Sequence, residues 1–192
     1  MQLLKERIIQ DGMVLVGNIL KVDSFLNHQI DPVLMAAIGE EFASRFANEP
    51  ITRILTLEAS GIAPALFTGL ALKVPVVFAK KTESSNQDSK TFMAPVHSFT
   101  RNRNNMIRVS RQYLSASDHV LLIDDFLAHG EALLGMADIV RQAGATLAGA
   151  GIVIEKGFQG GGRRVREMGI RVESLANIVD MSQGYVQFAD SL

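Results

Sequence analysis

The sequence predicts an α/β fold with a mostly parallel central sheet and helices on both faces. Two observations support this prediction. Short, continuous apolar runs, typical of strands covered on both faces, occur at 51–57, 74–79, 120–123 and 148–155. Segments of helical periodicity separate these runs, and strand–helix–strand units form parallel sheets. Ligands bind such sheets at the carboxyl ends of the strands, so the residues there are candidates for a functional site.

The chain begins with a predicted amphipathic helix, whose apolar stripe at positions 3, 4, 8 and 9 precedes Gly12, a residue that ends helices. Residues 14–29 then mix strand-like and polar residues. Asp31-Pro32 predicts a helix start, because Asp is a favourable N-cap and Pro a favourable first residue. Apolar residues recur every four positions from Leu34 to Phe46, which gives this helix one buried face.

The rest of the chain continues the alternation, and glycine-rich or polar segments separate the elements. The expected elements are, in order, a helix at 62–72, a mobile surface loop at 82–90, two antiparallel arms at 91–99 and 106–113 joined by residues 101–105, a helix at 131–143 that Gly144 ends, a glycine-rich loop at 156–162, a short helix at 164–168 and a strand at 170–175. Three arginines near the short helix, Arg163, Arg164 and Arg166, are expected to face solvent.

Composition excludes several classes of protein. The 192 residues are 47% hydrophobic and carry a net charge of −1, which indicates a single globular domain and argues against a dedicated nucleic-acid binder. The absence of cysteine excludes disulfides and thiolate metal sites and fits a reducing compartment. No apolar run approaches the ~20 residues of a membrane span, and no signal peptide is evident. We therefore expect a cytoplasmic protein.

The run at 120–123 is followed directly by two acids, Asp124 and Asp125. Adjacent carboxylates cannot both face the core, so we expect at least one to face a ligand, a metal or a cation. The next turn leads into a helix whose N-terminal N–H groups and dipole favour a phosphate. Carboxylates beside that phosphate suit the two hydroxyls of a sugar; a solvated acidic turn with a helix cap is the alternative interpretation.

Three other strand ends carry polar residues. Ser60 and Gly61 offer N–H groups at a helix N-terminus, where a second anion is expected to bind. Lys80 and Lys81 suit a polyphosphate, and Glu155-Lys156 ends the run at 148–155. Taken singly, each of these ends also fits ordinary helix capping or solvated charge.

Residues 120–132, an apolar strand, two acids, a short loop and a helix, resemble the signature of the type I phosphoribosyltransferases. Further segments resemble the xanthine phosphoribosyltransferases within that family, and the resemblance runs from about Leu4 to Ala176. These segments are Lys21 to Pro32, Ser60 to Ala65, Val74 to Ala79 and Gly151 to Lys156. The family's fold agrees with the parallel sheet already predicted.

The resemblance implies a role for each group of strand-end residues. Asp124 and Asp125 would hold the ribose hydroxyls of phosphoribosyl pyrophosphate (PRPP); Ala128, His129, Gly130, Glu131 and Ala132 would bind its 5′-phosphate; Ala59 and Ser60, with Lys80 or Lys81, would bind its pyrophosphate; and Leu20, Asn27 and Lys156 would bind the purine. In this family the turn at Ala59-Ser60 often has an unusual peptide geometry.

The implied reaction transfers the phosphoribosyl group from PRPP to N9 of xanthine, with Mg²⁺ bound through the pyrophosphate and not by protein side chains. The resemblance also implies a single domain over 1–192, with a hood at about 14–30 on the purine side, a flexible loop at about 81–108, and a homodimer. An acid or base that assists at the purine is left open, with Asp125 as the nearest candidate.

Two residues of the phosphate loop depart from the family pattern. His129 and Glu131 stand where the family usually has Asn and Gln. A carboxylate that faced the 5′-phosphate would repel it, whereas one that points outward would favour the first turn of the helix.

Other functions fit the sequence less well. The glycines at 149 and 151 precede their strand, which excludes a dinucleotide-binding fingerprint, and no G-x-x-x-x-G-K-[ST] motif occurs. The alternatives that remain open are an adenine or other purine phosphoribosyltransferase and a PRPP-sensing regulator without catalysis. Only about thirty residues precede Asp31, which we expect to be too few for a DNA-binding module.

Overall fold

The computed structural model describes residues 1–81, 90–98 and 103–189. The helices and strands are, in chain order, α1 (Gln2–Asp11), β1 (Met13–Leu15), β2 (Ile19–Lys21), the π-helix η1 (Asp23–Asn27), α2 (Pro32–Arg45), β3 (Arg53–Leu57), α3 (Ile62–Leu72), β4 (Val76–Ala79), β5 (Thr91–Ser98), β6 (Arg103–Ser110), the 3₁₀ turn η3 (Arg111–Tyr113), β7 (His119–Leu127), α4 (Glu131–Gln142), β8 (Thr146–Lys156), the 3₁₀ turn η4 (Gly157–Gln159), α5 (Gly161–Glu167), β9 (Val172–Asp180) and β10 (Gln187–Phe188).

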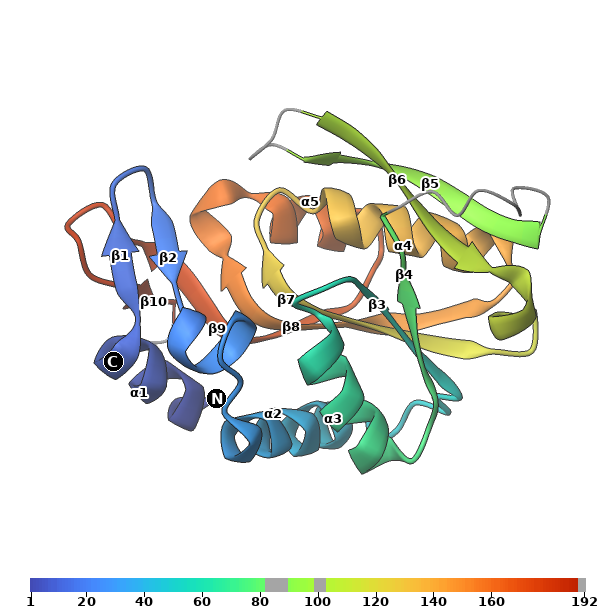
Figure 1. Ribbon diagram of the computed structural model, residues 1–192, viewed down its shortest axis with the longest axis horizontal. Helices are drawn as coiled ribbons and strands as arrows, with labels where there is room; N and C mark the ends of the chain where they lie inside the picture. The colour runs from blue at the N-terminus through green and yellow to red at the C-terminus, as the bar shows by residue number, and fades with distance from the viewer. Residues whose placement is uncertain (82–89, 99–102, 190–192) are drawn as a thin grey trace.

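Within the described residues, the central sheet has the order β10-β9-β8-β7-β3-β4. Every neighbouring pair in it is parallel except β10 and β9. Figure 1 shows α2 and α3 on one face of the sheet and α4 and α5 on the other. The mostly parallel sheet with helices on both faces, predicted from the sequence, is confirmed.

Two hydrophobic clusters fix the layers. One lies beneath α1 and α2 and includes the fully buried rings of Phe25, Phe42 and Phe46. The other lies beneath α4 and includes Val96 and Ile107 of the β5–β6 hairpin. The hairpin thus packs against the same face of the molecule as α4 (Figure 1).

The α2 helix begins as expected, because the Asp31 carboxylate accepts hydrogen bonds from the N–H groups of Val33 and Leu34. This helix packs very closely against α3. A Cβ at Gly39 would lie 2.5 Å from the carbonyl carbon and oxygen of Phe67. The close approach of the two helices therefore requires glycine at position 39.

The structure corrects several predicted boundaries. The strand expected at 120–123 extends to Leu127, because its ladder with β8 continues through the acidic pair. The strand expected at 170–175 is β9, which runs from Val172 to Asp180, because it pairs with β8 as far as Ile178 and with β10 at Asp180. The helix expected at 164–168 starts at Gly161, and η1, β1, β2 and β10 form where no clear period is visible in the sequence.

The antiparallel arms are confirmed as β5 and β6, which pair in register from Thr91–Ser110 to Ser98–Arg103. The second arm covers 103–110 and not 106–113, so residues 103–105 of the predicted link belong to the strand. The predicted loop at 82–90 lies outside the described residues except for Lys90, and so do residue 99 of the first predicted arm and residues 101 and 102 of the predicted link. None of the described helices is long and apolar enough to cross a membrane.

Candidate active site

The candidate site lies where the order of the sheet changes direction. The strand after β3 is added on one side, and the strands after β7 are added on the other. In parallel sheets a ligand crevice forms at such a switch point, beyond the carboxyl ends of the strands. β7 pairs with β3 only as far as Leu122 but with β8 as far as Leu127. The end of β7 therefore borders an opening on the β3 side.

Asp124 and Asp125 lie in this last part of β7, with exposed fractions of only 7% and 8%. The N–H group of Asp125 donates to Asp124 Oδ1 at 3.0 Å. Burial, together with the negative charge of Asp125, raises the pKa of Asp124 well above its usual range, and Lys81 opposes the shift. Asp124 therefore gains from a ligand that brings hydrogen-bond donors or positive charge.

Gly61 gives Asp124 the room it occupies. A Cβ at this position would lie 2.3 Å from Thr56 Oγ1 and 2.9 Å from Asp124 Oδ1. Among the described residues, the buried Thr56 hydroxyl has no hydrogen-bond partner. The turn that leads from β3 into α3 thus contacts the acidic residue of β7 directly.

That turn also contains a cis peptide bond between Glu58 and Ala59, the kind of unusual geometry that the resemblance implies. Ala59 and Ser60 line a shallow cavity of about 410 Å³ together with Asn27 of η1. The structure therefore places one residue expected to bind the purine beside the two expected to bind pyrophosphate.

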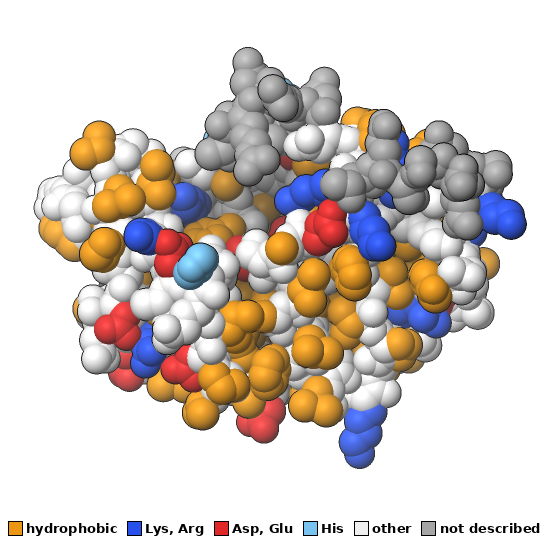
Figure 2. Space-filling view, viewed as in Figure 1, with side chains coloured by type: hydrophobic (Ala, Val, Ile, Leu, Met, Phe, Trp, Pro, Cys, Tyr) orange, Lys and Arg blue, Asp and Glu red, His pale blue; other side chains and the backbone are white. Residues whose placement is uncertain are grey.

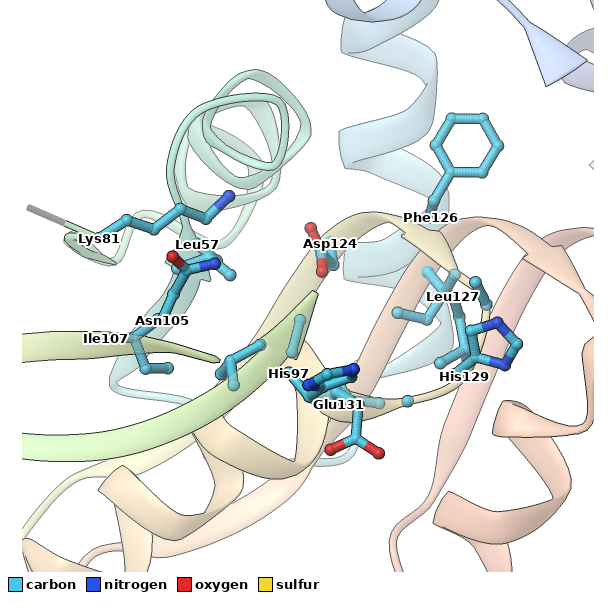
Figure 3. Close-up of a pocket in the computed structure, with 16 residues that line it drawn as sticks. Leu57, Lys81, His97, Asn105, Ile107, Asp124, Phe126, Leu127, His129 and Glu131 are labelled. Atoms are coloured by element: carbon cyan, nitrogen blue, oxygen red, sulfur yellow. The ribbon is translucent and has the colours of Figure 1, made fainter. Parts of the chain in front are cut away.

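The predicted phosphate loop connects β7 with α4. Gly130 adopts φ +89° just before the helix, and the loop is fixed from outside by a hydrogen bond from Gly161 N to Ala128 O (3.1 Å). All five predicted residues, Ala128, His129, Gly130, Glu131 and Ala132, line a cavity of about 230 Å³, which Asp124 and Lys81 also line (Figure 3). The loop presents the N-terminus of α4 to that cavity, as a phosphate site requires.

The Glu131 carboxylate accepts a hydrogen bond from the guanidinium of Arg164 in α5. Arg164 also donates to the carbonyl oxygen of His129 at 3.5 Å. Arg164 is exposed, as expected, but its side chain also ties α5 to the phosphate loop. Sequence reasoning missed the pair, since the two residues lie 33 positions apart.

The two lysines after β4 line different cavities. Lys81 lines the cavity with Asp124, and its backbone N–H donates to Glu58 Oε1 at 2.6 Å. The Lys80 ammonium lies 5.9 Å from the centre of the Phe78 ring and lines a different cavity at the sheet edge. Of the two alternatives that the sequence left open, only Lys81 is near the acidic pair.

Lys156 is the last residue of β8 and lies beside Phe126. Its ammonium lies 5.6 Å from the centre of the Phe126 ring and donates to the carbonyl oxygen of Asn18 at 3.1 Å. Burial lowers the pKa of Lys156. Leu20 lies on the same β1–β2 hairpin as Asn18 and is buried in the core cluster. Lys156 therefore joins the sheet to the N-terminal hairpin.

The neighbouring Glu155 is almost completely buried and forms a bidentate ion pair with Arg166 of α5, with both N–O distances at 2.8 Å. Ser174 of β9 also donates to this carboxylate. Burial raises the pKa of Glu155, but the hydrogen bonds from Arg166 and Ser174 and the charge of Arg166 bring it below its usual value. Arg166 is exposed, as expected, but its guanidinium also pairs with the buried Glu155 carboxylate. Arg163 is exposed as well.

Several cavity residues were not assigned from the sequence. Figure 3 shows Leu57, His97, Asn105, Ile107 and Phe126 around the space that Asp124 and the phosphate loop border. Phe126 follows the acidic pair directly and could have been found by that position. His97 and Asn105 come from the hairpin, and only its packing over α4 brings them to the site.

No group of three or more His, Asp or Glu side chains that could hold a metal ion occurs in the part of the chain that the structure describes. Of the acidic pair, Asp124 lines the cavity, and carboxylate oxygens are the kind of ligand that a hard cation prefers.

Residues 22–179 match the model of the phosphoribosyl transferase domain family. The match includes β3, β7, the acidic pair and the phosphate loop. This chain belongs to that family.

Curated relatives agree with the assignment. A xanthine phosphoribosyltransferase of Oceanobacillus iheyensis is 55% identical over 190 residues, which cover 99% of this chain and 98% of that protein. A xanthine phosphoribosyltransferase of Moorella thermoacetica is 58% identical over 187 residues, which cover 97% and 95% of the two chains. The resemblance seen in the sequence motifs therefore extends over nearly the whole of this phosphoribosyltransferase.

Solved structures share the fold. An adenine phosphoribosyltransferase of Rhodothermus marinus superposes with a TM-score of 0.75, covers 93% of this chain and 100% of its own, and is 18% identical. The Giardia lamblia enzyme complexed with 9-deazaadenine gives a TM-score of 0.74 at 18% identity, over 91% and 97% of the two chains. At this identity the likeness concerns the phosphoribosyltransferase fold alone.

Proposed function

We propose that this phosphoribosyltransferase transfers the 5-phosphoribosyl group from PRPP to N9 of xanthine, giving xanthosine 5′-monophosphate and pyrophosphate. The observation that carries the proposal is the identity of 55–58% with xanthine phosphoribosyltransferases over at least 97% of the chain. In the reaction the bond from the ribose C1 to the pyrophosphate oxygen breaks, and a bond from C1 to N9 forms. Pyrophosphate leaves with the bonding electrons, and the purine gives up its N9 proton.

The residues of the cleft are proposed to act by positioning and by electrostatics. Residues 128–132 would bind the 5′-phosphate with backbone N–H groups at the start of α4, and the carboxylates of Asp124 and Asp125 would accept hydrogen bonds from the ribose hydroxyls. Positive charge develops on the ribose as the bond to pyrophosphate breaks, and buried carboxylates next to it favour that state. We nominate no nucleophile.

Lys81 and the turn at Ala59-Ser60 are proposed to bind the departing pyrophosphate. Their support is proximity to Asp124: Lys81 lines the same cavity, and Gly61, next to Ser60, contacts the carboxylate. Mg²⁺ would neutralise charge on the pyrophosphate, bound through the oxygen atoms of that group. Lys80 is proposed to take no part, because its ammonium lies beside Phe78.

For the purine we propose Lys156, Asn27 and Leu20, with Lys156 donating a hydrogen bond to a carbonyl of the base. A donor at this place favours an oxo-purine over adenine, whose amino group would leave the ammonium unpaired. The approach of Lys156 to Phe126 and to the N-terminal hairpin supports the proposal.

A homodimer is also proposed. Exposed apolar residues gather over α2, α3 and β4, the face turned toward the viewer in Figure 2. They include Val33, Leu66, Leu70 and Phe78, with Val33 at 77% and Leu70 at 72% exposure. Contiguous apolar surface of this kind on a soluble protein indicates an interface.

The test is nucleotide formation from PRPP and Mg²⁺ with xanthine, guanine, hypoxanthine or adenine, resolved by chromatography. We expect xanthosine monophosphate to form fastest. Adenosine monophosphate as the main product would reject the proposed base, and PRPP binding without any product would indicate a regulator.

Lys156→Ala should reduce the preference for xanthine by about tenfold, the loss of one charged hydrogen bond; an unchanged preference would remove Lys156 from the purine site.

A further inference from the structure

Glu131 places a negative charge on the structure that is proposed to bind a phosphate. It is the first residue of α4, and its side chain lines the cavity of the phosphate loop. In Figure 3 this side chain points away from Asp124. The N-terminus of a helix favours anions, so a carboxylate there competes with a phosphate for the same positive end of the dipole.

Arg164 of α5, which lies outside the loop, forms an ion pair with Glu131. Its guanidinium donates to the Glu131 carboxylate and to the carbonyl oxygen of His129, so one side chain contacts two successive parts of the loop. The Arg164 side chain is about half exposed and does not line the cavity. It therefore acts on a ligand in the cavity through Glu131 and the loop backbone, and not by contact.

We propose that Arg164 is a positioning residue for PRPP binding, which holds the Glu131 carboxylate away from the 5′-phosphate and neutralises its charge. The inference rests on the proposed use of PRPP. It also accounts for the acidic residue in a phosphate loop, because Glu131 and Arg164 together carry no net charge. The Gly161 N–H to Ala128 O hydrogen bond from the same helix end supports a loop held in place by α5.

The experiment is a double-mutant cycle in the full-length enzyme. Removing the cation alone, Arg164→Ala, should raise KM for PRPP about tenfold, since it leaves two like charges a few ångströms apart in partly solvated surroundings. Glu131→Gln alone should lower KM for PRPP, because it leaves Arg164 with an unpaired positive charge beside the loop. The double variant should return to within about twofold of the wild type.

The readouts separate this role from a general loss of structure. KM for the purine should stay within about twofold in all three variants, and added salt should reduce the difference between Arg164→Ala and the wild type. The matched control is Arg163→Ala, which removes the same charge from an exposed neighbour on α5. We expect this control to leave KM for PRPP unchanged.

Two outcomes would overturn the proposal: an equal effect of Arg163→Ala and Arg164→Ala, or a double variant as impaired as Arg164→Ala. If Arg164→Ala does not fold, the sign of the Glu131→Gln effect still decides, because an increase in KM for PRPP contradicts the proposal. The dissociation constant of PRPP from calorimetry gives the same comparison without turnover. If the wild type binds PRPP but converts no purine, the proposed function is rejected. The double-mutant cycle can still be measured in that case, as dissociation constants of PRPP.

Discussion

Asp124 is held in surroundings that oppose its ionisation. It is buried at the end of β7, it accepts a hydrogen bond from the N–H of Asp125, and both burial and the Asp125 charge raise its pKa. A group whose pKa is higher in the folded than in the unfolded protein stabilises the fold at low pH, and that contribution is lost as the pH rises through the folded value. Above the usual pKa of aspartate, the raised pKa of Asp124 therefore lowers the stability of the fold.

This feature predicts opposite effects of Asp124→Asn on activity and on stability. We expect kcat/KM for PRPP to fall by about 10- to 100-fold, the loss of charged hydrogen bonds to the ribose. We expect Tm at pH 8 to rise by about 2–4 °C, and the gain to shrink as the pH is lowered toward 4. Calorimetry across this pH range, with initial rates at saturating xanthine, measures both.

The control is Asp138→Asn on α4. A hydrogen bond from Arg141 is the main cause that lowers the pKa of Asp138, so its carboxylate stabilises the fold above the usual pKa of aspartate. This variant should lower Tm at pH 8, and the loss should vanish at low pH. A decrease in Tm for Asp124→Asn at pH 8, or unchanged turnover, would contradict the role given to Asp124.

At the scale of single residues, the residues that line the cavity were predicted better than the residues that hold them in place. The acidic pair, the loop after it and the pair Lys80-Lys81 were indicated by their places at strand ends, and the family resemblance added the individual residues 128–132; of the two lysines, Lys81 lines the cavity. The partners of these residues come from other elements: Gly61 contacts Asp124, and Arg164 contacts Glu131. Such contacts depend on tertiary packing between segments far apart in the chain, and no local pattern encodes them.

The elements were predicted well where periodicity was strong. The capped α2 and the amphipathic α4 were expected within two residues of their observed ends. The strand boundaries at β7 and β9 were missed, because a ladder continues as long as its neighbour offers partners, whatever the polarity of the residues. The short β1, β2 and β10 depend on tertiary contacts and have too few residues to show a period.

The packing of α2 against α3 gives the second prediction. Gly39→Ala should destabilise the fold by about 1–3 kcal/mol in urea denaturation, because the new methyl group overlaps the Phe67 backbone, although alanine favours a helix by up to about 1 kcal/mol. Glu40→Ala, on the exposed side of the same helix, is the control and should change stability by less than about 0.5 kcal/mol. A Gly39→Ala variant as stable as the wild type would show that the helices separate at little cost.

At the scale of the whole molecule, the order of the strands decides where chemistry can occur. β3 and β7 diverge after Leu122, and the phosphate loop, the turn after β3 and Lys81 meet at this divergence. The alternation of strands and helices in the sequence predicts that the site lies at the carboxyl edge of the sheet. The strand order, and with it the side of β7 that opens, becomes known only from the structure.

The apolar surface over α2, α3 and β4 gives the third prediction. The wild type should sediment at twice the 20.9 kDa mass of the chain, and Leu70→Glu should shift it to the monomer, because a charge would have to be buried in the interface. Leu3→Glu, an exposed leucine on α1 away from this surface, should stay dimeric. A monomeric wild type, or two variants with the same mass, would contradict the dimer.

Two of the three arginines of α5 also bear on which residues can vary together among relatives. Arg164 pairs with Glu131 of the phosphate loop, and Arg166 pairs with Glu155 next to Lys156. A short helix outside the cavity thus balances the charge of Glu131 in the phosphate loop and that of the buried Glu155 at the end of β8. We expect these positions to change in pairs among relatives. Relatives with a neutral residue at position 131 should lack a cation at position 164. Relatives that keep Glu155 should have a cation close to it, either at position 166 or at a neighbouring position.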